Sequence, residues 1–179
     1  MPGLRLVAGS LAFTALTALT LAAGSPSPLR GSALPGWSWP LRPAPDRVVR
    51  AFDPPAQPWL PGNRGVDLAG HAGQRVHAAG PGVVSFAGVI AHIGVVSVTS
   101  GALRTTYEPL ALRVHRGQTV AAGAVVGTLT LAGSHCLPAA CLHWGLLRAG
   151  ADGDWAYLDP LALLGLEQVR LLPLDPSTP

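Results

Sequence analysis

Short apolar runs separated by glycine- and proline-containing turns dominate the middle of the chain. The runs are rich in valine and other β-branched residues and are too short for helices, so they predict β-strands. Turns are expected at Gly80-Pro81-Gly82, Ser100-Gly101 and Ala122-Gly123. The expected strands are Arg47–Phe52, Val66–Leu68, Arg75–Ala78, Val83–Ala87, Gly94–Thr99, Leu103–Tyr107, Val125–Leu129 and His143–Leu147. The pattern therefore predicts an all-β domain.

Helical signals are confined to one place. No helical periodicity of useful length precedes Asp159. The segment Asp159–Leu164 is expected to form a single turn, with Asp159 as the N-cap and Pro160 at the first position.

The two ends of the chain differ from its middle. Arg5 followed by the apolar stretch Leu11–Ala22 and small residues to Gly24 has the form of a secretory signal. We therefore divide the 179 residues into a signal peptide (1–24), a proline-rich linker (25–45), a domain (46–165) and a C-terminal tail (166–179). An uncleaved N-terminal anchor is the alternative to a cleaved signal. Trp37 and Trp39 in the linker are interpreted as incidental.

Composition narrows the function classes. Hydrophobic residues make up 49% of the chain and charged residues 12%, which allows a sizeable core. The net charge of +3 is modest, all basic residues are arginine, and no basic run occurs, so nucleic-acid binding has little support. The glycine and valine pattern of Gly117–Gly127 also occurs in biotinyl and lipoyl carrier domains, but those require a lysine and this chain has none.

The two cysteines, Cys136 and Cys141, are close in sequence. In an exported protein they are expected to form a disulfide that closes a small loop, and two free thiols are the alternative. Such a bridge pins a local hairpin rather than the whole fold, because the entropy gained by closing so short a loop is worth only about 2 kcal/mol.

Two segments carry the candidate chemistry. The first reads Pro-Gly-Asn-Arg-Gly-Val-Asp-Leu-Ala-Gly over residues 61–70, and the second reads Cys-Leu-His-Trp-Gly-Leu over residues 141–146. They resemble the His-x-x-x-Asp and His-x-His motifs of the M23 family, the lysostaphin- and LytM-like zinc endopeptidases that cut cell-wall peptides. Similar stretches occur in family order at Gly73–Val83, Leu103–Leu110 and Gly117–Gly127. The resemblance implies a twisted antiparallel sheet with an open groove.

The resemblance gives a role to each of five positions. Asp67 and His143 match a carboxylate ligand and a histidine ligand of zinc. Asn63 occupies the place of the other histidine ligand, and its neutral amide oxygen suits zinc less well than imidazole does. Cys141 and Pro109 occupy the places of two histidines that handle protons. Zinc is therefore the implied cofactor, Asp67, His143 and Asn63 are the implied metal-site residues, and no catalytic residue is assigned.

Other residues can replace the missing groups. A free Cys141 thiolate or His71 can serve as a ligand, and Glu108 as a base; an exposed turn for His71 and a polar strand end for Glu108 are the simpler interpretations. Tyr107 and Trp144 are expected either to line the groove or to pack in the core. The histidines expected to be solvated in loops are His92, His115 and His135.

Three functions remain open at this stage. The preferred one is a secreted or cell-wall-associated M23-family protein that acts at peptidoglycan with weak or no hydrolysis and binds peptidoglycan or a partner such as a cell-wall hydrolase. The second is an active zinc metalloendopeptidase with an altered ligand set. The third is a β-rich exported module without metal or wall contact.

Overall fold

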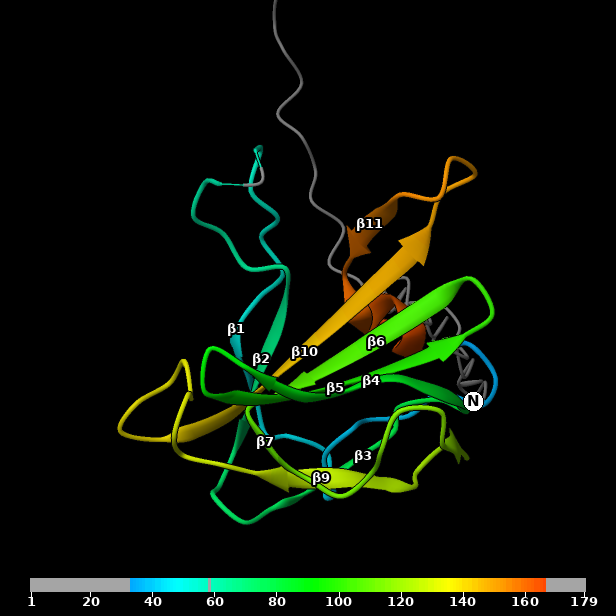
Figure 1. Ribbon diagram of the computed structural model, residues 1–179. Helices are drawn as coiled ribbons and strands as arrows, with labels where there is room; N and C mark the ends of the chain where they lie inside the picture. Colours follow the sequence, from blue (N-terminus) through cyan, green and yellow to red (C-terminus); the bar gives the residue numbers. More distant parts are fainter. Residues whose placement is uncertain (1–32, 58, 167–179) are drawn as a thin grey trace, which may run out of the picture.

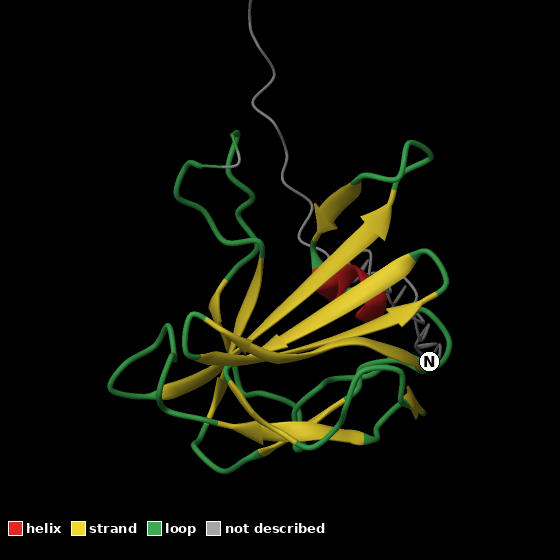
Figure 2. Cartoon of the chain, in the orientation of Figure 1, coloured by secondary structure: helices red, strands yellow, loops and turns green. Residues whose placement is uncertain are grey.

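The computed structural model describes residues 33–57 and 59–166. The predicted signal peptide (1–24), the start of the predicted linker and nearly all of the predicted tail lie outside these residues. The described part is built from antiparallel β-strands and one short 3₁₀-helix (Figures 1 and 2). This architecture confirms the all-β prediction. No helix within residues 33–57 and 59–166 has the length and apolarity needed to cross a bilayer.

The larger sheet holds eight strands in the order β1-β2-β10-β6-β5-β4-β8, with β11 paired to β10. Every pairing in it is antiparallel, as short connections between successive strands favour. Its strands are β1 (Val48–Arg50), β2 (Gly65–Gly70), β4 (Gly82–Ile90), β5 (Ile93–Ser100), β6 (Leu103–Glu108), β8 (Thr119–Val120), β10 (Ala140–Ala149) and β11 (Trp155–Leu158).

A second sheet of three strands has the order β3-β9-β7. It comprises β3 (Arg75–His77), β7 (Leu110–Leu112) and β9 (Val125–Leu129), and Figure 1 shows it beneath the large sheet. The core fills the space between the two sheets, and its fully buried members include Val66, Leu68, Val76, Val84, Val96, Val126, Leu129, Leu142 and Leu146.

Alternation along β10 separates the core from the opposite face of the large sheet. Leu142, Trp144 and Leu146 are buried in the core, whereas His143 between them is only partly buried and faces the other side. Tyr107 is also fully buried, and its hydroxyl accepts a hydrogen bond of 2.8 Å from the Ala79 backbone nitrogen. Of the two roles expected for Tyr107 and Trp144, the structure therefore shows core packing.

The segment expected to be a linker contributes to the core. Leu41 is fully buried and forms a β-bridge with Val76. Trp39 packs against Trp144 with ring centroids 6.2 Å apart, and Trp37 contacts the same core. The interpretation of the two tryptophans as incidental is wrong, because their rings cover apolar surface that the short strands leave open.

The predicted turn near the C-terminal end is confirmed. The 3₁₀-helix η1 spans Pro160–Leu164, and the Asp159 carboxylate accepts a hydrogen bond from the Leu161 backbone nitrogen as its N-cap. Gly165 ends the helix in a left-handed conformation at φ 65°, which glycine adopts without steric cost.

Burial of Tyr107 predicts a loss of stability at alkaline pH. Burial raises the pKa of Tyr107 to about 12, and its hydrogen bonds do not offset this. Because the unfolded chain releases the same proton near pH 10, stability should fall as pH rises from about 10 to about 12, by roughly 2–3 kcal/mol. Urea unfolding between pH 9 and 12 should show this fall, and Tyr107→Phe should lessen it. An equal fall in both proteins would contradict the assignment to Tyr107.

Candidate metal centre

The pairing of β2 with β10 brings the two segments singled out in the sequence together. Asp67 and His143 are direct cross-strand partners. The His143 Nδ1 atom lies 2.8 Å from Asp67 Oδ1. Two positions along, Gly65 faces Gly145, and a Cβ atom on Gly65 would lie 2.9 Å from His143 Nε2 and 2.4 Å from the Trp144 carbonyl oxygen. Glycine at position 65 thus leaves room for the His143 ring.

A third side chain completes the cluster. His135 reaches it from the loop between β9 and β10, with its Nδ1 atom 3.4 Å from Asp67 Oδ1. The two imidazole rings lie 5.2 Å apart between centroids. One ligand atom from each of Asp67, His135 and His143 lies within 4.8 Å of the others. Asp67 is only 1% exposed, His143 13% and His135 39%, so the cluster opens to solvent on the His135 side.

The environment keeps Asp67 ionised. Burial alone would raise the pKa of its carboxyl group, but the hydrogen bond from His143 and the charges of His143 and His135 outweigh burial and hold this pKa below its usual value. A metal ligand must be deprotonated, so the carboxylate is in the required state at neutral pH.

The expectation of a solvated loop histidine holds only in part for His135, which lies in a loop and is 39% exposed but whose ring also contacts Asp67. Its loop is fixed at two points: the disulfide between Cys136 and Cys141, and the Ser134 hydroxyl. That hydroxyl accepts hydrogen bonds from the backbone nitrogens of Cys136 (3.2 Å) and Cys141 (3.1 Å). Because Cys141 lies two residues before His143 on β10, the bridge holds the His135 loop close to the strand that carries His143. The adjacency of His135 to a bridged cysteine was the available sequence signal.

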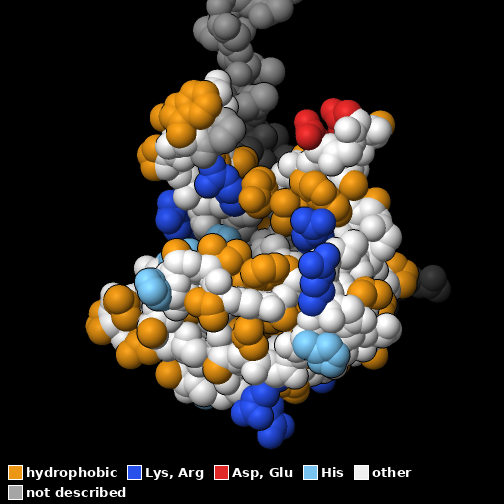
Figure 3. Space-filling model, in the orientation of Figure 1, with side chains coloured by type: hydrophobic (Ala, Val, Ile, Leu, Met, Phe, Trp, Pro, Cys, Tyr) orange, Lys and Arg blue, Asp and Glu red, His pale blue; other side chains and the backbone are white. Residues whose placement is uncertain are grey.

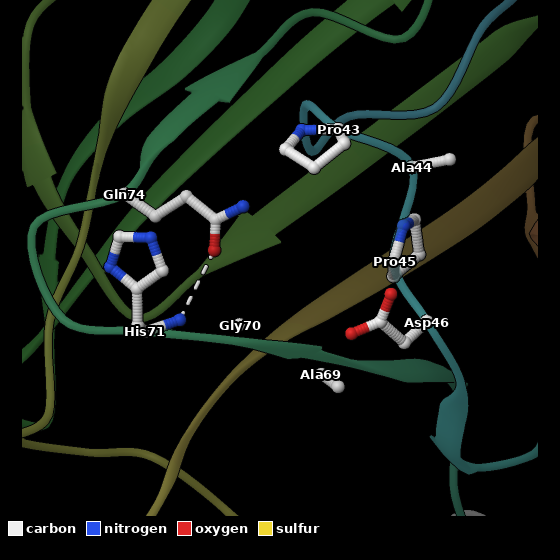
Figure 4. Close-up of a pocket in the computed structure, with 8 residues that line it drawn as sticks. All are labelled: Pro43, Ala44, Pro45, Asp46, Ala69, Gly70, His71 and Gln74. Carbon is white, nitrogen blue, oxygen red and sulfur yellow. Dashed lines mark hydrogen bonds between the residues drawn. The ribbon is translucent and has the colours of Figure 1, made fainter.

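The predicted disulfide is confirmed, and it removes one alternative ligand. With both cysteines bridged, Cys141 has no thiolate to offer a metal. His71, the other alternative, is exposed in the turn after β2, where its Nδ1 atom lies 3.2 Å from the Ala72 carbonyl oxygen. Figure 4 shows it with Gln74 at a separate pocket that also includes Asp46.

Asn63 lies beside the candidate centre, with its side chain engaged with the backbone. Its Nδ2 atom donates hydrogen bonds to the carbonyl oxygens of Ala51 (3.0 Å) and Arg50 (3.4 Å). The backbone of Asn63 also bridges Asp53. The side chain is buried and ties the chain after β1 to the start of β2. This structural role gives a reason for an amide at this position.

The groove above the cluster has a volume of about 540 Å³. Its lining includes His143, Glu108 and Thr106 from strands of the large sheet, and Asn63 and His135 from the segments that precede β2 and β10. Glu108 is the cross-strand partner of His143 on β6. Pro109, which follows it, is buried. Among the described residues that line the groove, Glu108 is the sole carboxylate.

The donor set suits zinc. Catalytic zinc sites commonly have three protein ligands of nitrogen and oxygen type and leave a fourth position open. Ligand atoms around a tetrahedral zinc are about 3.3 Å apart, and the 3.4 Å between Asp67 and His135 is close to this spacing. The shorter 2.8 Å contact between Asp67 and His143 is a hydrogen bond whose proton a metal would displace.

Loss of the disulfide should weaken metal binding. In a double variant, Cys136→Ser with Cys141→Ser, the His135 loop keeps only its Ser134 contacts and must be ordered when metal binds. Fixing one additional residue costs about 1–2 kcal/mol, so zinc affinity should fall about tenfold. Competition with a chromophoric zinc chelator measures this, with circular dichroism to verify the fold. Unchanged affinity in a folded double variant would show that the bridge does not position His135.

Comparison with known protein families matches residues 61–155 to Peptidase family M23. The chain is 51% identical over 138 residues to the uncharacterized protein Rv2891 of Mycobacterium tuberculosis. The aligned residues make up 76% of this chain and 55% of the relative. The chain thus spans about half the length of the curated relatives it matches.

Solved structures show the same fold. Csd3 of Helicobacter pylori superposes with a TM-score of 0.58 at 23% identity, over 79% of this chain and 36% of Csd3. The catalytic domain of the antimicrobial peptidase lysostaphin from Staphylococcus simulans gives a TM-score of 0.55 at 21% identity, over 66% of this chain and 91% of that domain.

Proposed function

Because this chain belongs to peptidase family M23, we propose that it acts at bacterial peptidoglycan outside the cytoplasm, binding wall peptides in its groove beside a zinc ion with weak or no hydrolysis. The proposal of weak or no hydrolysis rests on residues 109 and 141, which occupy the places of the family's two proton-handling histidines. Pro109 is buried and has no proton to transfer, and Cys141 is bridged to Cys136. A groove of about 540 Å³ nevertheless opens beside the cluster.

Each part of the groove has a role in this proposal. Asp67, His135 and His143 would hold the zinc, which when bound polarises a peptide carbonyl or a water molecule. Of the described lining residues that would not bind the zinc, Glu108 is the one carboxylate and Tyr157 the one phenol. A general acid or base contributes about 100- to 10,000-fold to a rate, so the loss of two such groups leaves little hydrolysis.

An extracytoplasmic location is part of the proposal. The N-terminal sequence has the form of a secretory signal. The disulfide in the loop that carries His135 suits an oxidising compartment. The wall itself is the proposed partner, and a cell-wall hydrolase that the domain positions there is a further candidate.

Sedimentation with purified peptidoglycan tests the proposal. The mature chain should pellet with the wall material while releasing no peptide fragments detectable by mass spectrometry. A variant with Arg113→Gln, an exposed position outside the groove lining, serves as a control for nonspecific charge effects and should pellet equally. A chain that stays in the supernatant would contradict the proposed role at peptidoglycan.

A second candidate, an active zinc endopeptidase, is favoured by one observation. The cluster supplies three ligands despite the asparagine at position 63. This enzyme would use His135 in place of Cys141 or His71, the ligands expected from the sequence. Release of wall peptides that disappears in His143→Ala would support it over the first candidate.

A further inference from the structure

The groove has a basic lining. Arg50, Arg64 and Arg104 all line it, against the single carboxylate of Glu108. Figure 3 shows basic side chains around the hollow on this face, and the chain has no lysine, so these are arginines. Asp67 is buried and already contacts both histidines. The groove therefore offers the positive charges of Arg50 and Arg104 to whatever enters it.

We propose that the groove binds an extended peptide through a free carboxylate, that Arg104 pairs with this carboxylate, and that the peptide runs from Arg104 toward the metal cluster. This inference rests on the proposed function, because it specifies the class of wall peptide that the groove takes. The supporting observations are the fixed geometry of Arg104, its position on the sheet and the side chains that line the groove between it and His143.

The contacts of the Arg104 guanidinium fix its position and leave its terminal nitrogens available to a ligand. Its guanidinium carbon lies 3.9 Å from the centre of the Trp155 ring. Its Nε atom donates to Thr99 Oγ1 at 3.4 Å, which leaves the terminal nitrogens of the planar fork for a bidentate partner. Within the part of the chain that the structure describes, no carboxylate lies within ion-pair distance of Arg104. A ligand carboxylate can fill this role.

Strand register gives the distance from Arg104 to the metal cluster. Glu108 pairs with His143, and Arg104 lies four residues earlier on β6, on the same face. At about 3.3 Å per residue this separation is about 13 Å. An extended peptide covers the same distance in about four residues. The ligand carboxylate should therefore lie about four residues from the peptide group that reaches the cluster.

Thr106 lies midway between Arg104 and Glu108 on the same face of β6, and it lines the groove. Its cross-strand partner on β10 is Gly145, where a Cβ atom would lie 2.4 Å from Thr106 Oγ1. Glycine at position 145 thus leaves room for the Thr106 side chain. The groove between Arg104 and the cluster is therefore lined by a short polar side chain on this strand.

The wall of the groove on the β4–β5 side is apolar. Phe86, Ile90 and Val95 line it, and Phe86 and Ile90 are exposed. This wall suits apolar side chains of a peptide. Carboxylate recognition at one end and apolar contact along one side together define a peptide with a free carboxylate and apolar side chains as the ligand.

Fluorescence anisotropy with synthetic peptides tests the inference. The probes are labelled tetra- and pentapeptides of peptidoglycan stem composition, each prepared with a free or an amidated C-terminal carboxylate. The free acid should bind at least about tenfold more tightly than the amide, because a charge-assisted bidentate pair is lost on amidation. Arg104→Gln should reduce binding of the free acid to the level of the amide, whereas Arg113→Gln should leave it unchanged. Arg104→Lys, which keeps the charge but not the planar fork, should give an intermediate affinity.

Sedimentation with intact peptidoglycan, measured in parallel, separates this inference from the proposed function. If the chain pellets with the wall but binds acid and amide equally, or if Arg104→Gln and Arg113→Gln behave alike, carboxylate recognition by Arg104 is overturned and the proposed function stands. If the chain neither pellets nor binds any peptide, both are overturned.

Discussion

Replacing His135 with alanine is expected to lower zinc affinity by at least about 100-fold. Loss of a residue that only orients a ligand typically costs 10- to 100-fold in affinity, and the loss of a ligand itself should cost no less. The cluster would retain only Asp67 and His143, and two protein ligands fall short of the three found in catalytic zinc sites. Isothermal titration with zinc measures the change directly.

His115→Ala is the matched control, because His115 is also an exposed loop histidine but is outside the cluster. It should leave zinc affinity unchanged. Asn63→His adds an imidazole beside the cluster and should strengthen binding. Equal affinities in the wild type and in His135→Ala would show that His135 is not a ligand and that zinc, if bound, uses other groups.

Hydrolysis of wall peptides is expected to be at least about 10,000-fold slower than in an M23 peptidase that has both proton-handling histidines. The estimate takes the lower bound of about 100-fold for each missing general acid or base. Both positions are blocked for different reasons: Pro109 has no ionisable side chain, and Cys141 is held in a disulfide. Side-by-side assays on purified peptidoglycan, read by mass spectrometry, measure the ratio.

The zinc-loaded protein is the appropriate sample for this assay, so that an empty site is not mistaken for an inactive one. Any residual release should vanish in His143→Ala. Release at a rate within tenfold of the complete enzyme would contradict the proposal of weak or no hydrolysis, and would indicate that Glu108 performs the proton transfers.

Much of the fold could be predicted from the sequence because its strands follow local rules. The strand over His143–Leu147 and the cap at Asp159 depend on neighbours in sequence, and both occur as expected. The contribution of Leu41 and Trp39 to the core could not be predicted in this way. Their burial depends on an apolar surface that exists only after distant strands have paired, and a proline-rich composition gives no sign of it.

In the candidate site, too, some residues could be predicted from the sequence and others depend on tertiary contacts. Asp67 and His143 belong to sequence motifs on paired strands, so their proximity followed from the resemblance. His135 is in a loop without regular structure, and its position depends on a disulfide and on the Ser134 hydrogen bonds. The role of Asn63 in holding the chain after β1 likewise depends on tertiary contacts.

Elemental analysis of the mature chain, purified without chelator and with its disulfide intact, tests the central claim that Asp67, His135 and His143 form a metal centre. We predict about one zinc per chain in the wild type and little in His135→Ala or His143→Ala. Absence of zinc from the wild type after reconstitution and desalting would contradict the metal centre and leave the groove as a binding site alone.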